Sequence, residues 1–509
     1  MERIFKSEKA IKTIEDIRKF LLSDRWLAIL FFVSMIIVGL HSHMPKEGFH
    51  IWGTVVMAYI TGLVFLFTGD IMAMLSPLLF TYLVAIRCYN SLEEFKKIWF
   101  LVIPLVLILL FNIFAYGKKP TIKGSQFIPM LLVSVAVTLG GAGVISKEDY
   151  FGGAALYNML GIGFGMLLFY CGLYPRISTE NGYSLIEKLT KIMVYVGLAG
   201  ALMIIAHYII NINDVIDNII NENKGGILYM RWRNNTSTIL MMAMPFAFFA
   251  ANKKSYSIII GFIFYLAMLL TGSRGGMVFG TVELVMCIIM FVLYDRRRRL
   301  AYASICGCFV IVALIFLPEI TQFLNYTLSR LFKVLNEFLL GGEDTETRVR
   351  HYARGVKDFF NHPIFGTGLG NMTNRDIFKS KPGSLCWYHC EPIQIAGSFG
   401  TVGIIAFVYQ FFKRNMLIWK KATLFNMTIF LSYISLELMS LVNPGILCPV
   451  PYLLLVIIYM IVVEKCDDGE AQERIPILQK FREKRKKKSE EKSEEKAEEK
   501  AEEKNLVTK

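Results

Sequence analysis

Long apolar segments separated by short polar ones run through the chain as far as residue 463. Most approach the ~20 residues that an α-helix needs to cross a bilayer. Lipid offers no partners for backbone polar groups, so these segments must be helical. The predicted spans are 26–41, 51–68, 70–86, 98–116, 126–145, 153–174, 191–211, 236–251, 256–272, 276–294, 301–319, 393–412, 422–440 and 446–463. The pattern predicts an all-α polytopic membrane protein, a bundle of about 12–14 transmembrane helices.

The segment before the first span, residues 1–25, is polar but amphipathic. Apolar residues recur in it at helical spacing: Ile4, Ile11, Ile14, Ile17, Phe20 and Leu21. This spacing predicts a helix that lies on the cytoplasmic surface of the membrane. No small-residue cleavage site follows the first apolar run, so we expect no cleavable signal.

Basic residues set the expected orientation, because cytoplasmic loops of membrane proteins are enriched in Lys and Arg. The basic segments that we place in the cytoplasm are the N-terminal helix, 118–123, 253–254, 296–299, 413–421 and the C-terminal tail. The loop with Arg87, Lys96 and Lys97 falls outside and is the exception. We therefore predict a protein of the cytoplasmic (inner or plasma) membrane with both termini in the cytoplasm.

This topology sends two larger loops outside, residues 212–235 and residues 320–392. The second far exceeds the usual helix connections of about 2–8 residues, so we expect it to fold as a large helical extracytoplasmic domain. We expect a helix near 346–360. Its inward-facing residues should be Val349, Tyr352, Val356, Phe359 and Phe360.

The predicted organisation has five parts. These are the amphipathic helix 1–25, a transmembrane region 26–319 with about 11 spans, the outer loop 320–392, about three further spans in 393–463, and the charged tail 464–509. The repeat "SEEKSEEKAEEKAEEK" in the tail predicts disorder or a single solvated helix, and we place it in the cytoplasm.

Composition agrees with a membrane protein and excludes a string of soluble domains. The 509 residues are 54% hydrophobic, and the mean hydropathy is +0.48. The net charge of +14 gathers at the ends and in short loops, which indicates contact with membrane lipids and not with nucleic acid. The nine cysteines form no CxxC framework, and many lie in apolar runs, so they predict buried thiols.

The segment "LLTGSRGGMVFG" (269–280) places Arg274 and two glycines between two predicted spans, at the outer surface. An arginine at the end of a span commonly reaches to lipid head groups. Outer loops are usually poor in arginine, however, and glycines allow the backbone to approach a bulky ligand. We therefore favour a functional role for Arg274.

Further basic residues lie on the same side. Arg231 and Arg233 end the first outer loop beside Asn234 and Asn235, in "YMRWRNNTSTIL". Guanidinium groups suit phosphate oxygens, and several around one site would suit a pyrophosphate.

Three more arginines, Arg348, Arg350 and Arg354, lie in "TETRVRHYARGVKDFF" within the large loop. They could contribute to the same anion site. The alternative is a solvated face of an amphipathic helix, which fits Arg354 better than Arg348.

Two features of the later loop could carry chemistry. Gly366, Gly368 and Gly370 look like a phosphate-binding loop, although no strand precedes them. His389 lies where the loop re-enters the membrane, and an imidazole there could accept a proton from an attacking hydroxyl. A hydrogen-bonded interface histidine is an equal alternative.

Four other residues have open interpretations. Cys386 and Cys390 flank His389. A metal site here would need a second pair of ligands, which the sequence does not offer. Whether the two cysteines form a disulfide is left open. Glu283 and Glu437 are acids within predicted spans, which makes each a functional candidate. We favour pairing of these acids with an arginine such as Arg274.

The segments "RWRNNTSTILMMAMP", "LLTGSRGG", "TRVRHYARGVKDFFNHPIFGTGLGNM" and "HCEPIQIAGSFGTVGIIA", in this order, resemble the O-antigen ligase and polymerase family over about residues 230–410. The resemblance implies a multi-span glycosyltransferase of the GT-C class, in surface polysaccharide biosynthesis of the cell envelope. It implies a polyprenyl (undecaprenyl) pyrophosphate-linked glycan as donor and a glycan or lipid-linked glycan as acceptor. No nucleotide sugar, cofactor or essential metal is implied, and other polysaccharide assembly proteins are candidate partners.

The resemblance also assigns roles. Arg274 matches the family's donor-binding arginine, and Arg348 matches the loop arginine four residues before an aromatic. His389 matches the histidine proposed as general base or acceptor-positioning group. The residue after this histidine is commonly Asn in the family but is Cys390 here. This difference weakens any argument that relies on hydrogen bonds of the Asn side-chain amide.

Further positions keep the family's spacing. Gln394, Gly400 and Gly403 follow the histidine as the family pattern requires, and Asn234 or Asn235 matches an asparagine that opens an earlier span.

We therefore predict a polymerase or ligase, which share their donor chemistry. Catalysis falls to His389, Arg274 and Arg348. The predicted substrate-binding residues are Arg231, Arg233, Asn234, Asn235, Arg350, Gln394, Glu283 and Glu437. A lipid-linked oligosaccharide flippase is the main alternative, although the chain shows no convincing internal repeat. A non-catalytic membrane scaffold is another.

Overall fold

The computed structural model describes most of the chain as α-helix. The described residues are 8–43, 50–88, 98–144, 163–177, 184–220, 228, 233–251, 253–294, 299–315, 317–318, 321, 343–369, 388–421, 423–442 and 450–466. The helices are α1 (Glu8–Leu21), α2 (Asp24–His43), α3 (His50–Phe67), α4 (Ile71–Cys88), η1 (Trp99–Leu101), α6 (Val102–Tyr116), α7 (Phe127–Leu139), α10 (Met166–Leu173), α11 (Leu185–Ile210), α12 (Ile212–Ile220), α13 (Arg233–Ala250), α14 (Ser257–Leu270), α15 (Arg274–Tyr294), α16 (Arg299–Ile315), α18 (Glu343–Asn361), α20 (Glu391–Lys421), α21 (Leu424–Ser440) and α22 (Val450–Lys465).

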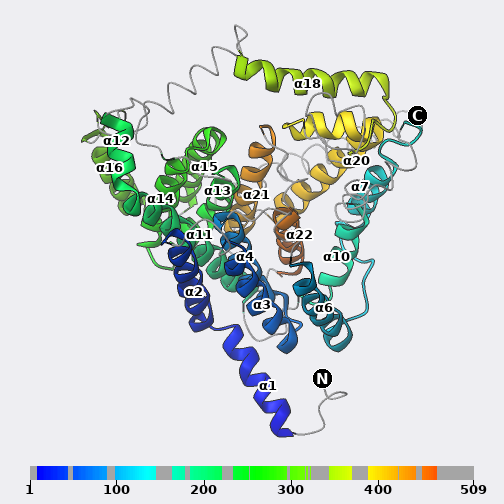
Figure 1. The fold of residues 1–509 in the computed structure, drawn as a ribbon, viewed down its shortest axis with the longest axis horizontal. Helices are drawn as coiled ribbons and strands as arrows, with labels where there is room; N and C mark the ends of the chain where they lie inside the picture. The colour runs from blue at the N-terminus through cyan, green and yellow to red at the C-terminus, as the bar shows by residue number, and fades with distance from the viewer. Residues whose placement is uncertain are drawn as a thin grey trace, which may run out of the picture.

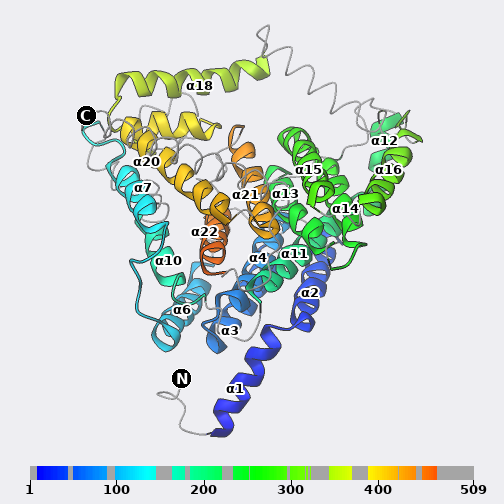
Figure 2. The same ribbon diagram turned by 180° about the vertical axis from the view of Figure 1, so that it is seen from behind.

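The helices form a bundle, and a different helix marks each of its two ends. Figures 1 and 2 show α18 lying across one end, while α1 projects from the opposite end. Every predicted span contains a helix or part of one. The architecture is that of a polytopic helical membrane protein, as the apolar pattern predicts.

Length and composition identify individual membrane-spanning candidates. Five described helices, or six if the bent pair α1–α2 counts as one span, are long and apolar enough to cross a membrane. Five shorter apolar helices accompany them. The total of about 12–14 spans stays a prediction.

Helix α13 forms the centre of the bundle. Its residues from Thr236 to Phe248 are buried, and it packs against α11, α14, α15 and α21. In contrast, α6 exposes apolar side chains along most of its length, including Phe114 at 85% exposure. A soluble bundle would not leave such a helix in water, whereas a bilayer solvates it.

The amphipathic N-terminal helix is present as α1. The chain bends by 62° between α1 and α2, so the two helices do not form one straight rod. Arg18 Nε donates to the Phe67 carbonyl at 3.1 Å, and Lys188 Nζ donates to the Leu22 carbonyl at 2.7 Å. These contacts fix α1 and the bend against α3 and α11.

Helix α20 is broken at Gly400, which has φ 63° and ψ −156°. The amides that begin its second half find carbonyl partners in the preceding loop. Thr401 donates to the Pro363 carbonyl at 2.7 Å, and Val402 donates to the Ile364 carbonyl at 3.2 Å. Figure 1 shows the first part of α20 beside α18 and the second part turning into the bundle. The span predicted over 393–412 therefore lies within α20, which is long and apolar enough to cross a membrane but is broken at Gly400.

The helix predicted near 346–360 exists as α18, but its buried face is polar. His351 and Asp358 are 5% and 3% exposed, and Gly355 lies on the same face. Val356 and Phe360, which we expected to face inward, are 45% and 73% exposed. This orientation prediction is wrong because hydrogen bonds, and not apolar burial, determine which face of α18 packs against α20.

We expect Gly400→Ala to destabilise the protein. The new Cβ would lie 2.4 Å from the Ile364 carbonyl oxygen, and alanine is strained at this φ. A cost of about 1–3 kcal/mol in unfolding free energy follows from the strain alone. Thermal unfolding in detergent measures it, with Gly172→Ala as the control because its Cβ would meet no atom within 4 Å. Equal melting temperatures for the two variants would contradict this role of Gly400.

Candidate functional site

Two helices that bear predicted site residues begin side by side. Helix α13 begins at Arg233 and α15 begins at Arg274. Ser273 joins them, because its Oγ donates to Asn234 Oδ1 at 2.8 Å. The same Oγ caps α15 by accepting from the Gly276 amide at 3.2 Å. Sequence positions forty residues apart therefore meet at one point.

Glycines allow α15 to pack closely at this point. A Cβ at Gly276 would lie 2.8 Å from the Ser237 Cβ on α13. A Cβ at Gly275 would lie 3.0 Å from Val442, just after α21. The two glycines after Arg274 are thus explained by contacts with α13 and with the end of α21.

Positive charge concentrates where these helices start. The first backbone N–H groups of a helix have no intrahelical partners, and the helix dipole adds positive partial charge. Acidic residues usually balance this charge, yet the first turns of α13 and α15 contain none. Each instead begins with a half-buried arginine, Arg233 or Arg274. The arrangement suits an anion that offers several oxygens, such as a phosphate or pyrophosphate.

His389 lies just before α20 and close to α18. It is half-buried, and its ring centroid is 5.6 Å from that of the buried His351. The end of α21 links the two parts of the site, because Met439 and Val442 neighbour Gly275 while Ser440 and Leu441 share a cavity with Glu391. The structure thus brings the starts of α13, α15 and α20 to one end of the bundle.

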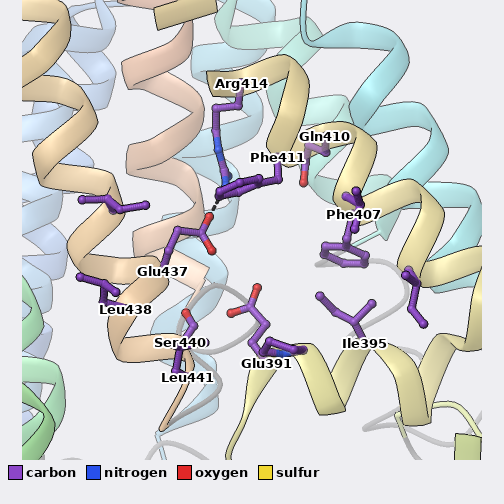
Figure 3. A pocket seen from close by; sticks show the side chains of 14 residues that line it. Glu391, Ile395, Phe407, Gln410, Phe411, Arg414, Glu437, Leu438, Ser440 and Leu441 are labelled. Atoms are coloured by element: carbon purple, nitrogen blue, oxygen red, sulfur yellow. Dashed lines mark hydrogen bonds and ion pairs between the residues drawn. The ribbon is translucent and has the colours of Figure 1, made fainter. Parts of the chain in front are cut away.

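A cavity of about 370 Å³ lies between α20 and α21. Figure 3 shows Glu391 at one end, the Arg414–Glu437 pair at the other, and Ile395 and Phe407 along one wall. Most of the remaining lining is aliphatic or aromatic. The cavity could therefore accept a lipid chain whose polar end lies near Glu391.

Glu437 pairs with Arg414 of α20 and not with Arg274. Arg414 is 4% exposed, and its guanidinium lies 4.8 Å from the centre of the Tyr433 ring. The expectation of an arginine partner is confirmed, but its identity is corrected. Arg414 lies in the basic segment 413–421, which we placed in the cytoplasm, and nothing in the sequence pattern marked it as Glu437's partner.

Glu283 lies on α15, nine residues after Arg274, and is 1% exposed. At 1.5 Å of rise per residue, the two side chains sit more than two turns apart on one helix, so they cannot pair. Within the described chain, Glu283 forms no ion pair, and the expected pairing with an arginine is wrong for this residue. Its role in substrate binding stays a prediction.

The glycines at 366 and 368 do not form a phosphate-binding loop. The Thr367 and Gly368 amides donate to the Gly397 and Ser398 carbonyls, at 2.9 and 2.8 Å, which end the first half of α20. Gly366 has φ 62°, and its Cβ would lie 2.4 Å from the Ser398 carbonyl carbon. These amides are committed to joining the loop to the break in α20, so they are not available to a phosphate.

The remaining predicted residues divide by location. Gln394 is fully buried; its Oε1 accepts from the Tyr388 amide at 2.8 Å and its Nε2 donates to Ser398 Oγ at 2.9 Å. Both ends of this amide are thus engaged within the protein. Arg350 is exposed on α18. Asn235 is half-buried in the first turn of α13.

Several predicted positions lie outside the described residues: Arg231, Gly370, Cys386 and the side chain of Arg348. Cys390 is a half-buried thiol, and burial raises its pKa, with a smaller contribution from Glu391. The raised pKa keeps the thiol protonated and a poor metal ligand. Within the described part of the chain, no three His, Cys, Asp or Glu side chains could hold a metal ion.

Four residues near the site are not among the predicted site residues: His351, Asp358, Tyr388 and Arg414. Arg354 was interpreted as part of a solvated helix face, but its Nε forms an ion pair of 2.9 Å with Oδ1 of the buried Asp358. One signal was present, since 351, 355, 358 and 362 share a helix face and carry polar residues or glycine.

The fold and the site define a multi-pass helical membrane protein whose polar residues gather at one end of the bundle, beside an apolar cavity. Residues 259–408 match the family model described as O-antigen ligase. This match supports an assignment to the O-antigen ligase/polymerase family over the matched segment. The matched segment contains Arg274, Arg348 and His389 but ends before Arg414 and Glu437. No curated protein matches the chain.

Proposed function

We propose that this membrane enzyme transfers a polyprenyl-pyrophosphate-linked glycan to a sugar hydroxyl of an acceptor, on the outer face of the cytoplasmic membrane. The family match supports a glycosyltransferase-type activity of the O-antigen ligase/polymerase type. The observation that carries the proposal is the pair of arginines, Arg233 and Arg274, at two adjoining helix N-termini whose own first turns contain no acidic residue. A pyrophosphate leaving group has the charge and the oxygens that this arrangement favours.

The proposed chemistry is one displacement at the anomeric carbon of the donor. The acceptor oxygen forms the new bond to this carbon while the bond from the carbon to the pyrophosphate oxygen breaks. His389 accepts the proton of the acceptor hydroxyl. Arg274 and the helix N-termini stabilise the charge that develops on the pyrophosphate. A single displacement inverts the configuration of the anomeric carbon.

The lipid part of the donor needs an apolar surface next to the site. The cavity between α20 and α21 supplies one, since its walls are mainly Ile, Phe, Val and Leu side chains and Glu391, two residues after His389, lines one end of it. Charge placement supports an outer location for this end, because the basic amphipathic helix α1 lies at the opposite end.

A transfer assay tests the proposal. Purified protein in lipid vesicles is supplied with a defined lipid-linked oligosaccharide and its acceptor, and both glycan transfer and lipid translocation are followed. We expect transfer by the native protein, and a loss of about 10²–10⁴-fold in His389→Ala, as for a removed general base. His207→Ala, on α11, serves as the histidine control and should retain transfer. Translocation without transfer would instead identify a flippase.

A further inference from the structure

His389 is held in an unusual backbone conformation. Its φ is 57°, and it is the sole non-glycine among the described residues with a positive φ. L-residues other than glycine rarely adopt this region, and they remain there only when the surroundings hold them. The residues next to His389 should therefore show how it is held.

Tyr388, the preceding residue, is fully buried and tied to both α18 and α20. Its hydroxyl donates to Asp358 Oδ2 on α18 at 2.6 Å. Its backbone amide donates to Gln394 Oε1 on α20 at 2.8 Å. A side-chain bond and a backbone bond thus restrain this residue from two directions.

Two glycines hold the Tyr388 ring between the helices. A Cβ at Gly355 of α18 would lie 3.1 Å from the ring's Cγ, and a Cβ at Gly397 of α20 would lie 2.8 Å from its Cε2. A larger residue at either position would displace the ring. The ring therefore fixes the separation of α18 and α20 where His389 emerges.

The partners of Tyr388 are themselves fixed. Asp358 is 3% exposed and accepts from Arg354 Nε at 2.9 Å. Gln394 donates to the buried Ser398 Oγ at 2.9 Å. A network in which every member is bonded is rigid and expensive to rearrange.

We infer that Tyr388 is a positioning residue for His389, and that its hydrogen bond to Asp358 anchors the imidazole at the reaction centre. This inference rests on the proposed function, because it assumes that His389 accepts the acceptor's proton. The buried polar face of α18 then has a purpose, since it couples the outer loop to the catalytic histidine. Catalytic groups need such support, because a displacement of about 1 Å can cost 10²-fold in rate.

The test is Tyr388→Phe, which removes one hydroxyl and leaves the ring between its glycines. We expect kcat to fall about 10- to 100-fold with little change in the KM for the donor, because binding is left intact. Tyr59→Phe is the matched control. Tyr59 lies on α3, away from the site, and its hydroxyl donates to the Leu101 carbonyl at 2.9 Å. This control should keep the native kcat.

A second readout is independent of catalysis. Hydrogen exchange of a peptide that covers 388–394 should be faster in Tyr388→Phe than in the native protein and unchanged in Tyr59→Phe. Asp358→Asn should lower kcat in the same direction, and the double variant should lose less than the product of the two single losses.

The outcomes separate the two proposals. A native kcat in Tyr388→Phe, a loss confined to KM, or an equal loss in Tyr59→Phe overturns the inference. If the native protein transfers no glycan, the proposed function fails, and the exchange of peptide 388–394 alone decides whether Tyr388 holds this segment.

Discussion

We expect Arg274→Ala to lower glycan transfer by at least about 10²–10³-fold, as for a lost preorganised donor at a developing charge. The protein should still fold and insert in the membrane. Arg274 is half-buried at the first position of α15 and is not part of the buried apolar core. The cap made by Ser273 and the contacts of Gly275 and Gly276 do not depend on the guanidinium.

Two further variants sharpen this result. Arg274→Lys keeps the charge but loses the planar fork, so it should recover only part of the activity. Arg25→Ala removes an exposed arginine at the start of α2 and should leave transfer unchanged. Transfer is measured on vesicles with equal amounts of inserted protein. A native rate of glycan transfer in Arg274→Ala would show that this arginine does not contribute to the reaction.

The sequence predicts the helices well because one physical requirement, burial of backbone polar groups in lipid, acts on every span alike. Each predicted span coincides with at least part of a helix. The break at Gly400 was missed because apolar residues continue on both sides of it. What makes the break is the loop at 363–368, whose carbonyls and amides replace those of the missing helical turn, and such a long-range exchange leaves no local pattern.

The prediction of which face of α18 is buried was wrong for a related reason. Helical periodicity assigns apolar residues to the buried face, so Val356 and Phe360 were placed inward. In the structure, Asp358 and His351 take that face. The Tyr388 hydroxyl, thirty residues further along the chain, donates to Asp358, and the His389 ring lies against the His351 ring. Exposed apolar residues are tolerable on α18 if it lies at a membrane surface.

The candidate site was predicted in part. The pattern of charges singled out Arg274 and Arg233, and the structure joins the first turns of their helices through Asn234 and Ser273. The position of His389 at the end of the large loop made it a candidate, and the resemblance to a family then assigned it a catalytic role. Neither route could find Arg414, because an arginine near the end of a span has several ordinary explanations and its partner, Glu437, lies on another helix.

The Arg414–Glu437 pair should matter to stability more than any exposed ion pair. Its side chains are 5% and 19% exposed, and they join α20 to α21 at the end of the cavity away from Glu391. Removing one partner leaves a buried charge without compensation, which typically costs about 3–5 kcal/mol. We therefore expect Arg414→Met to unfold at a clearly lower temperature in detergent. The control is Lys253→Met, because Lys253 and Glu187 form an exposed pair 3.1 Å apart, worth about 0–1 kcal/mol.

The double variant Arg414→Met, Glu437→Leu separates charge from packing. With both charges gone, well-packed apolar residues of similar volume can replace a buried pair at little cost or with a gain. We expect its melting temperature to return close to that of the native protein. If it stays as low as that of Arg414→Met, the loss comes from packing around the arginine stem and the Tyr433 ring, and an uncompensated Glu437 is not the cause. Glycan transfer by the restored double variant then measures what the pair contributes beyond stability, because the cavity keeps its walls but loses its two charges.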